Sequence, residues 1–166
     1  MNLNFTTVLP SEQSKVLELF KTAAQRIATM NIDHWQYWHD PPPEKIQWVT
    51  QGITNAEYFF IHNDQQELIG MVRILNEDLL YWGKQEENAT YIHSLLVTDA
   101  FNGRGMGKKI IASICAKASN KGSRFLRLDA DSKNPKLCRY YEGLGFKKVG
   151  QVELPLSVYH LYEKEL

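Results

Sequence analysis

The spacing of apolar residues along the chain predicts four helices. Near the N-terminus they recur every three or four positions, which is typical of a helix with one buried face, and Ser11 precedes them as a candidate cap. A second helix is expected over 43–51, where Gly52 would end it. A third should follow a glycine-rich turn and end near Asn120, and a fourth should occupy 134–145. The apolar positions of the first and third helices are Val16, Phe20, Ala23, Ile27, Ile110, Ile111, Ile114, Cys115 and Ala118.

Seven further stretches have the composition of strands. "EYFFIHN" and "ELIGMVRIL" are joined by "NDQQ", which predicts a hairpin. The stretch "ATYIHSLLV" is almost continuously apolar, so we expect a central strand that is covered on both faces. The remaining strands are predicted in "NFTTVL", "RFLRLDA", "FKKVGQV" and "PLSVYHLYEKEL".

These elements follow one another in the order β-α-α-β-β-β-α-β-α-β-β. Antiparallel hairpins come first and a strand–helix–strand crossover follows, which indicates a mixed sheet. We therefore predict an α/β (α+β) fold class, with a mixed, mostly antiparallel sheet of six to seven strands and about four helices. No repeat or long Gly/Ser linker divides the 166 residues, so we expect a single domain over 1–166.

The charge balance narrows the choice of partners. Lys plus Arg and Asp plus Glu both number 19, so the formal net charge is zero, which argues against a protein that binds nucleic acid. No apolar run approaches the roughly 18 residues of a membrane span, and the N-terminus lacks the pattern of a signal peptide. We expect a cytoplasmic protein without membrane contact, as a monomer or a homodimer.

The two cysteines do not indicate a metal site. Cys115 and Cys138 lie far apart in the chain and lack the CxxC or CxH spacing of a zinc site, so we expect no metal. Cys115 shares a helical face with Ile111 and Ala118, and we expect it to be a small buried hydrophobic residue.

The stretch "VTDAFNGRGMGKKIIASI" places three glycines beside cations at the start of an apolar helix. Because Gly103, Gly105 and Gly107 lack side chains, the backbone can approach an anion, and the amides of a helix N-terminus bind anions. A P-loop would need glycine in place of Asn102 and Ser or Thr in place of the second lysine. A dinucleotide-binding turn fails as well, because Lys108 stands where its third glycine belongs. A glycine-rich turn that only begins a helix remains an alternative.

The longer stretch "LLVTDAFNGRGMGKKI" resembles the pyrophosphate loop of the GNAT superfamily of acyl-CoA-dependent N-acyltransferases. That loop reads [Gln/Arg]-x-x-Gly-x-[Gly/Ala] between a central strand and a helix, and Gly105 and Gly107 match it. Asn102 stands in the slot of Gln or Arg, and Asp99 stands where many relatives have proline. The stretch "NPKLCRYYEGLGFKKVG" is similar to the C-terminal signature of the same family. The residues in register with that signature are Asn134, Leu137, Tyr140, Tyr141, Gly145 and Phe146.

The resemblance implies a GNAT-like fold with acetyl-CoA as the cofactor. In this family the glycine turn binds the pyrophosphate of coenzyme A, and the main chain of the preceding strand bulges and bonds the pantetheine and the thioester carbonyl. The cofactor-binding residues that the resemblance implies are Leu95, Leu96, Val97, Asn102, Gly103, Arg104, Gly105, Met106, Gly107, Lys108, Asn134 and Tyr141.

Acyl transfer to an amine needs an acceptor for the amine's proton and a donor for the departing thiolate. Tyr141 matches the family's thiolate-protonating tyrosine, and a phenol is a suitable donor. His93 stands where some members carry a base, and a neutral imidazole at pH 7 suits that role. That His93 is instead a structural histidine of the core is an equal alternative. In that case a chain of water molecules leading to Glu77 or Asp78 could serve as the base in place of His93. Strand alternation would place His93 and Leu95 on one face.

The sequence says less about the acceptor. The resemblance places Trp35 and Trp38 in the region that walls the acceptor pocket, although packing is the commoner role of such aromatic residues. An acidic loop that contains Glu77 could attract a cationic amine. Arg73 lies in an apolar strand and needs a carboxylate or carbonyl partner if it is buried, so it is a candidate for orienting a substrate carboxylate.

These observations together predict an N-acetyltransferase that moves an acetyl group from acetyl-CoA directly to a primary amine of a small molecule. Acetylation of a protein N-terminus or a lysine is the alternative among enzymes. A non-catalytic sensor that binds acyl-CoA without turnover is the alternative from another class of protein.

Overall fold

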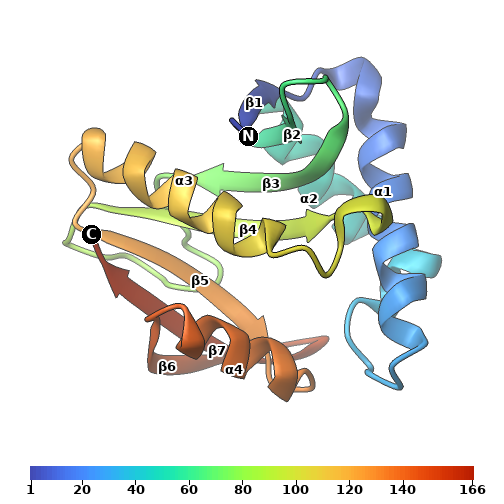
Figure 1. Ribbon diagram of the computed structural model, residues 1–166. Coiled ribbons are helices and arrows are strands. Elements are labelled where there is room, and N and C mark those ends of the chain that lie inside the picture. Colours follow the sequence, from blue (N-terminus) through green and yellow to red (C-terminus); the bar gives the residue numbers. More distant parts are fainter. The chain divides into compact units, whose positions relative to one another are not determined.

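The computed structural model describes all 166 residues and contains a seven-stranded sheet with four α-helices (Figure 1). The predicted order of strands and helices is confirmed along the whole chain. None of the helices combines the length and the apolar character that a membrane crossing requires. The strands are β1 (Asn4–Thr7), β2 (Tyr58–His62), β3 (Leu68–Leu75), β4 (Ala89–Val97), β5 (Phe125–Asp131), β6 (Lys147–Leu154) and β7 (Ser157–Glu165). The helices are α1 (Gln13–Ala28), α2 (Pro43–Thr54), α3 (Met106–Asn120) and α4 (Pro135–Gly143), with 3-10 turns at Pro10–Glu12, Gln36–His39 and Asp99–Phe101.

The strands lie in the order β1-β2-β3-β4-β5-β7-β6 across the sheet. β4 and β5 are parallel, whereas the pairs β1–β2, β2–β3, β5–β7 and β6–β7 are antiparallel. The predicted α/β (α+β) class with a mixed, mostly antiparallel sheet is therefore confirmed. β4 takes the predicted central position, and its first five residues are buried, which explains its almost continuous apolar character.

The chain folds into two compact units. The first unit comprises Met1–Arg73 and Ser94–Gly107, and the second comprises Ile74–His93 and Lys108–Leu166. Strands β3 and β4 therefore contribute residues to each unit. That the whole chain behaves as a single domain stays a prediction.

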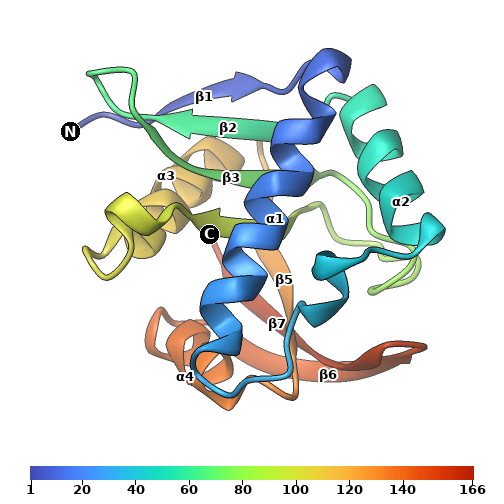
Figure 2. The same ribbon diagram turned by 90° about the vertical axis from the view of Figure 1, so that its right-hand side faces the viewer.

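In the first unit, α1 crosses the face of the hairpin formed by β2 and β3 (Figure 2). Val16 and Phe20 of α1 join Phe60 and Met71 of the hairpin in one buried cluster. The ring of Trp38 stacks on Phe20 with the two centroids 4.0 Å apart. The helical spacing read from the sequence thus places one face of α1 against the sheet, where burial of apolar area stabilises the unit.

Two helix ends in the first unit differ from the prediction. Ser11 does not cap α1, because it lies within the 3-10 turn Pro10–Glu12 and Glu12 takes the cap position of the helix. α2 does not end at Gly52 but continues to Thr54. Gly52 has a negative φ and not the left-handed conformation of a glycine that ends a helix. The presence of glycine at this position therefore has another cause.

In the second unit, β6 is an edge strand, and its pairing with β7 shifts register between Lys148 and Gly150. α4 ends at Gly143, and Gly145, where the prediction ended this helix, adopts a φ of +87° in the turn that follows. A second buried cluster joins rings from the loop between β3 and β4 with rings from β4, β5 and β7. Its buried members are Tyr81, Trp82, Ala89, Tyr91, Phe125 and Tyr159.

Candidate active site

The glycine turn before α3 is open to an approaching ligand. Gly103 and Gly105 have φ angles of +74° and +71°, and a Cβ added to either would meet no atom within 4 Å. Asn102 and Arg104 are exposed, and α3 begins at Met106, so the first amides of the helix have no partner within it. An anion can therefore reach these N–H groups without meeting a side chain, and the turn fits the pyrophosphate of coenzyme A.

Strand β4 is interrupted at Ser94. This residue has a φ of +57°, a left-handed conformation that is rare inside a strand. The parallel register of β4 with β5 covers Ala89–Ile92 and ends there. The regular alternation of side chains along β4 is therefore interrupted between His93 and Leu95, and the prediction that these two share a face stays untested.

The end of β4 is held by α1 in the first unit. Arg26 Nη2 donates to the main-chain oxygen of Val97 at 3.1 Å, and Nη1 pairs with the carboxylate of Asp99. Asp99, which stands in place of a proline common in the resembled family, thus has a partner in this chain. The arginine joins the helix to main chain that the sequence assigns to cofactor binding.

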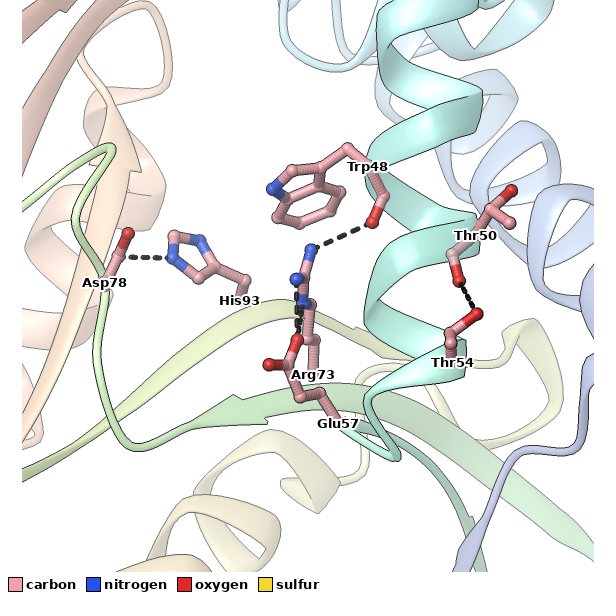
Figure 3. A network of polar contacts seen from close by, with 7 residues as sticks. All are labelled: Trp48, Thr50, Thr54, Glu57, Arg73, Asp78 and His93. Carbon is pink, nitrogen blue, oxygen red and sulfur yellow. Dashed lines mark hydrogen bonds and ion pairs between the residues drawn. The ribbon is translucent and has the colours of Figure 1, made fainter.

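In the second unit, the ring of His93 lies between two carboxylates. Nε2 is 2.6 Å from Asp78 Oδ2 (Figure 3), and Nδ1 is 2.9 Å from Asp129 Oδ1. The side chains of His93 and Asp78 are each 6% exposed, and that of Asp129 is 10% exposed. Asp78 Oδ1 also accepts the Tyr81 N–H at 3.2 Å, and the Tyr81 ring packs on the imidazole at 4.7 Å.

These surroundings change the protonation of His93. Burial by itself lowers the pKa of His93, but the charge of Asp129, together with the hydrogen bonds to both carboxylates and the charge of Asp78, raises it to about 9. The expectation of a neutral imidazole at pH 7 is therefore wrong. At neutral pH the ring carries both of its protons, and it becomes a base only when one of them is lost.

Tyr141 lies in the same unit, with its ring 5.9 Å from that of Phe146 and 6.3 Å from that of Tyr162. Burial raises the pKa of Tyr141, and the negative charge of Asp129 raises it further. The phenol therefore keeps its proton throughout the neutral range, as a proton donor must. His93 and Tyr141 thus both experience the charge of Asp129.

Asp78, His93 and Asp129 also form the one group of side chains whose ligand atoms, all within 4.8 Å of one another, could hold a metal ion. Each ring nitrogen faces a carboxylate oxygen, and a nitrogen of the ring would have to give up its proton before it could bind an ion.

Comparison with known proteins identifies the family. The sequence profile of the acetyltransferase (GNAT) family matches residues 24–146. The chain belongs to this family. It is 27% identical over 120 residues to the uncharacterized N-acetyltransferase YesJ of Bacillus subtilis (strain 168). That match covers 69% of this chain and 65% of the length of YesJ, slightly less than two thirds of the relative.

Solved structures of GNAT acetyltransferases share the fold. One from Listeria monocytogenes 4b F2365 is 22% identical, with a TM-score of 0.77 over 99% of this chain and 95% of that chain. Another from Streptococcus agalactiae 2603 is 19% identical, with a TM-score of 0.72 over the same shares of the two chains. The predicted family and its fold are confirmed.

Arg73 has its polar partners within this GNAT protein. Its Nε and Nη2 both donate to Glu57 Oε2, at 2.9 and 2.6 Å, and Nη1 donates to the Trp48 carbonyl at 3.1 Å (Figure 3). The guanidinium also lies 4.2 Å from the centroid of the Trp48 ring. The expected carboxylate and carbonyl partners thus exist within the chain itself. That Arg73 orients a substrate carboxylate stays a prediction.

The other predicted acceptor contacts divide between core and surface. Trp38 is 3% exposed and stacked on Phe20, so it is a core residue, and its predicted contact with substrate stays a prediction. Trp35 is partly buried, has a φ of +63° and meets Phe20 edge-on at 5.3 Å. Glu77 is exposed on the loop directly before Asp78. The roles of Trp35 and Glu77 stay predictions.

Three further residues have a defined local environment. Asn134 caps α4, since its Oδ1 accepts the Leu137 N–H at 3.1 Å, and its predicted contact with the cofactor stays a prediction. Cys115 is only partly buried, so the expectation of a buried hydrophobic residue was too strong. Cys138 is buried, with its sulfur 3.8 Å from His160 Nδ1.

Two carboxylates that take part in these contacts were not predicted from the sequence. Asp129 contacts His93, and Glu57 neutralises Arg73. A signal for the first was present, because β5 places Arg127, Asp129 and Asp131 among apolar residues, and buried charges require partners. Applying to β5 the argument used for Arg73 would have marked Asp129 as a residue with a partner to find.

Proposed function

We propose that the protein is an N-acetyltransferase that transfers an acetyl group from acetyl-CoA directly to the primary amine of a small molecule. The observation that carries the proposal is the segment from Ser94 to Met106. It combines a left-handed break in β4 with an open glycine turn that leads into α3. Main chain at 95–97 lies beyond the register with β5, which supports its use in binding pantetheine.

The residues of this segment supply what an acyl-CoA needs. The amides at the start of α3 bind the pyrophosphate, and the exposed cations Arg104 and Lys108 add positive charge for phosphate groups. Bound acetyl-CoA supplies a thioester carbonyl as the acyl donor. The main-chain groups of 95–97 orient that carbonyl and stabilise the charge that develops on its oxygen.

His93 and Tyr141 carry the proton transfers. His93, once its ring has lost a proton, accepts one from the ammonium and thereby frees the lone pair of the nitrogen for attack. Tyr141 gives its phenolic proton to the sulfur as the C–S bond breaks and the C–N bond forms. The second proton of the nitrogen restores the phenol, and the proton on His93 leaves to solvent.

A small-molecule acceptor is supported by the charge of the chain. With a formal net charge of zero, the protein lacks the general electrostatic attraction that would collect an acidic macromolecule. A buried cluster of two carboxylates and one imidazole also suits a cationic amine better than an anionic acceptor.

Binding of the cofactor is tested by thermal shift with coenzyme A. Coenzyme A should raise the melting temperature, as a ligand selective for the folded state does. Gly105→Glu should abolish the shift, because it places a carboxylate in the path of the phosphates. Gly122→Glu is the matched control, since Gly122 also has a positive φ, +84°, with nothing within 4 Å of an added Cβ. Equal shifts in both variants would contradict the assignment of the glycine turn.

Transfer is tested by incubating the protein with acetyl-CoA and a library of primary amines. Mass spectrometry should find an acetylated amine together with an equal amount of free coenzyme A thiol. Acetylation of added peptides in preference to every small amine would contradict the proposed acceptor class. A thermal shift with coenzyme A but no acetylated product from any amine or peptide would identify a sensor and overturn the proposal of an enzyme.

A further inference from the structure

The contacts of His93 require more protons than a neutral ring carries. A neutral imidazole has one N–H and one lone pair, so it can donate to only one of two carboxylates. Here Asp78 Oδ2 and Asp129 Oδ1 face the two ring nitrogens at 2.6 and 2.9 Å. Asp129 Oδ1 is buried and accepts no hydrogen bond of good geometry, and it forms an ion pair with His93 Nδ1 at 2.9 Å. The geometry is that of an imidazolium between two carboxylates.

We infer that Asp78 and Asp129 are positioning residues for the acetyl transfer, which act through His93 and make its imidazole a base strong enough to deprotonate an alkylammonium. This inference rests on the proposed function, because it assumes that His93 serves the transfer. It concerns neither a contact with the substrate nor a contact with the cofactor.

The reason for two carboxylates lies in the proton that has to be moved. An ordinary imidazole is about four units less basic than an alkylamine, so proton transfer from the ammonium is unfavourable by about 10⁴-fold. When the cluster loses its proton, it leaves two buried carboxylates beside a neutral ring, which is an unfavourable charge arrangement. The cluster therefore has a high affinity for a proton, and the equilibrium for proton transfer from the ammonium to His93 is less unfavourable than with an ordinary imidazole.

The titratable side chains around the ring come from several elements. The loop between β3 and β4 contributes Asp78 and the neutral phenol of Tyr81, and β5 contributes Asp129. From α4, Tyr141 experiences the charge of Asp129, and from β7, Tyr159 meets the Tyr81 ring at 5.2 Å. The charges that act on His93 are thus those of the two aspartates.

The loop that carries Asp78 is itself fixed to the second unit, as a positioning role demands. Trp82 packs on Tyr91 with centroids 5.8 Å apart, and Glu87 pairs with Arg127 at 3.3 Å. Arg127 is 3% exposed and also donates to the hydroxyl of Tyr91 at 2.9 Å. Asp78 is therefore presented to His93 by an anchored loop.

The basicity of the cluster also bears on the acceptor. A strong base is needed only for a strongly basic amine, so the cluster assigns the acceptor to the primary alkylamines rather than to weakly basic arylamines.

The first test needs no substitution. The ring of His93 is followed by NMR during a pH titration of the wild-type protein without substrate. It should titrate about 1 to 3 units above the ordinary value of about 6.5, the range expected for a cation with close carboxylates. Titration of His93 at or below its ordinary value would overturn the inference, whatever the protein does to acetyl-CoA.

The second test compares the pH dependence of kcat/KM in the variants Asp78→Asn and Asp129→Asn, with an alkylamine that the wild-type enzyme acetylates. The ascending limb should move to lower pH by about 1 to 3 units in each variant. Ionisation of the amine is the same in all profiles, so the shift reports on the enzyme. Asp131→Asn is the matched control, because Asp131 is a buried carboxylate of the same strand that bonds Ser157 and not His93.

The outcomes separate this inference from the proposed function. Absence of turnover in the wild-type protein would reject the proposed function and, with it, this role of the aspartates. Turnover with an ascending limb that stays in place in both variants would reject only the inference. If one variant fails to fold, as judged by circular dichroism, the other variant and the wild-type titration decide.

Discussion

Gly52 of α2 has no side chain at the point where the guanidinium of Arg73 passes over the helix. A β-carbon on Gly52 would lie 2.7 Å from Arg73 Nε and 2.6 Å from Cε2 of Tyr58. The guanidinium cannot move aside cheaply, because Glu57 and the Trp48 carbonyl hold it. This glycine, which reads as a helix stop in the sequence, is therefore a packing requirement inside the helix.

A substitution at this position should reverse the usual rule for helical glycines. Gly52→Ala should lower the free energy of unfolding by about 1 to 3 kcal/mol, the usual cost of overpacking a core. Gly143→Ala in α4 is the control, because nothing lies within 4 Å of its added Cβ, and alanine should be neutral or stabilising by up to about 1 kcal/mol there. Urea unfolding measures both. Equal effects of the two substitutions would contradict the close contact with Arg73.

Removal of the Tyr141 hydroxyl should slow turnover and leave the fold intact. Tyr141→Phe should reduce kcat by about 10²-fold, the lower range for one general acid. The thermal shift with coenzyme A should remain, since the ring is kept. Tyr140→Phe is the neighbouring control, because Tyr140 is 40% exposed and is not assigned to the reaction. A kcat for Tyr141→Phe within twofold of wild type would exclude Tyr141 as a rate-limiting proton donor.

The stability of the protein should fall as the pH rises above neutrality. Folding raises the pKa of His93 from an ordinary value near 6.5 to about 9, so the folded state binds the proton more tightly. The resulting stabilisation is complete below about pH 6.5 and is lost as the pH rises through about 9. Melting temperatures measured from pH 6 to 10 should show this decline. The decline should be reduced in His93→Gln, and an identical slope in that variant would refute the assignment.

Loss of the contact between Arg26 and β4 should weaken the cofactor without changing the chemistry. Arg26→Ala removes the donor to the Val97 oxygen, and one hydrogen bond contributes about 0.5 to 1.5 kcal/mol. We expect KM for acetyl-CoA to rise by about 2- to 10-fold while kcat changes little. Arg124→Ala removes an exposed arginine paired with Glu165 and should leave KM unchanged. A lower kcat at unchanged KM for Arg26→Ala would contradict this positioning.

Local patterns in the sequence predicted most of the fold. The helix of Val16 and Phe20 and the central strand around Ile92 follow from apolar spacing, which depends only on neighbouring residues. The left-handed conformation of Ser94 could not be predicted in this way, because serine does not require it. A serine reads as an ordinary strand residue, and the break in β4 depends on packing between segments that are distant in the chain.

The candidate site shows the same division. The sequence marked His93, and it separately marked Asp78 as a substitute base, but the structure makes them members of one cluster. Their meeting with Asp129 depends on the parallel register of β4 and β5, in which Ile92 lies opposite Leu128. Such a register is not visible in either strand alone. The protonation of His93 was therefore the property that the sequence predicted least well.

The two edge strands of the sheet affect the tendency of the protein to aggregate. β1 is only four residues long, and β6 begins with Lys147 and Lys148 and then shifts register before Gly150. Unpaired strand edges are templates for the addition of foreign strands, and short length, lysines and irregular register all oppose it. Both margins of the sheet therefore discourage edge-to-edge aggregation, and this sheet is protected at the two places where fibril-like growth would begin.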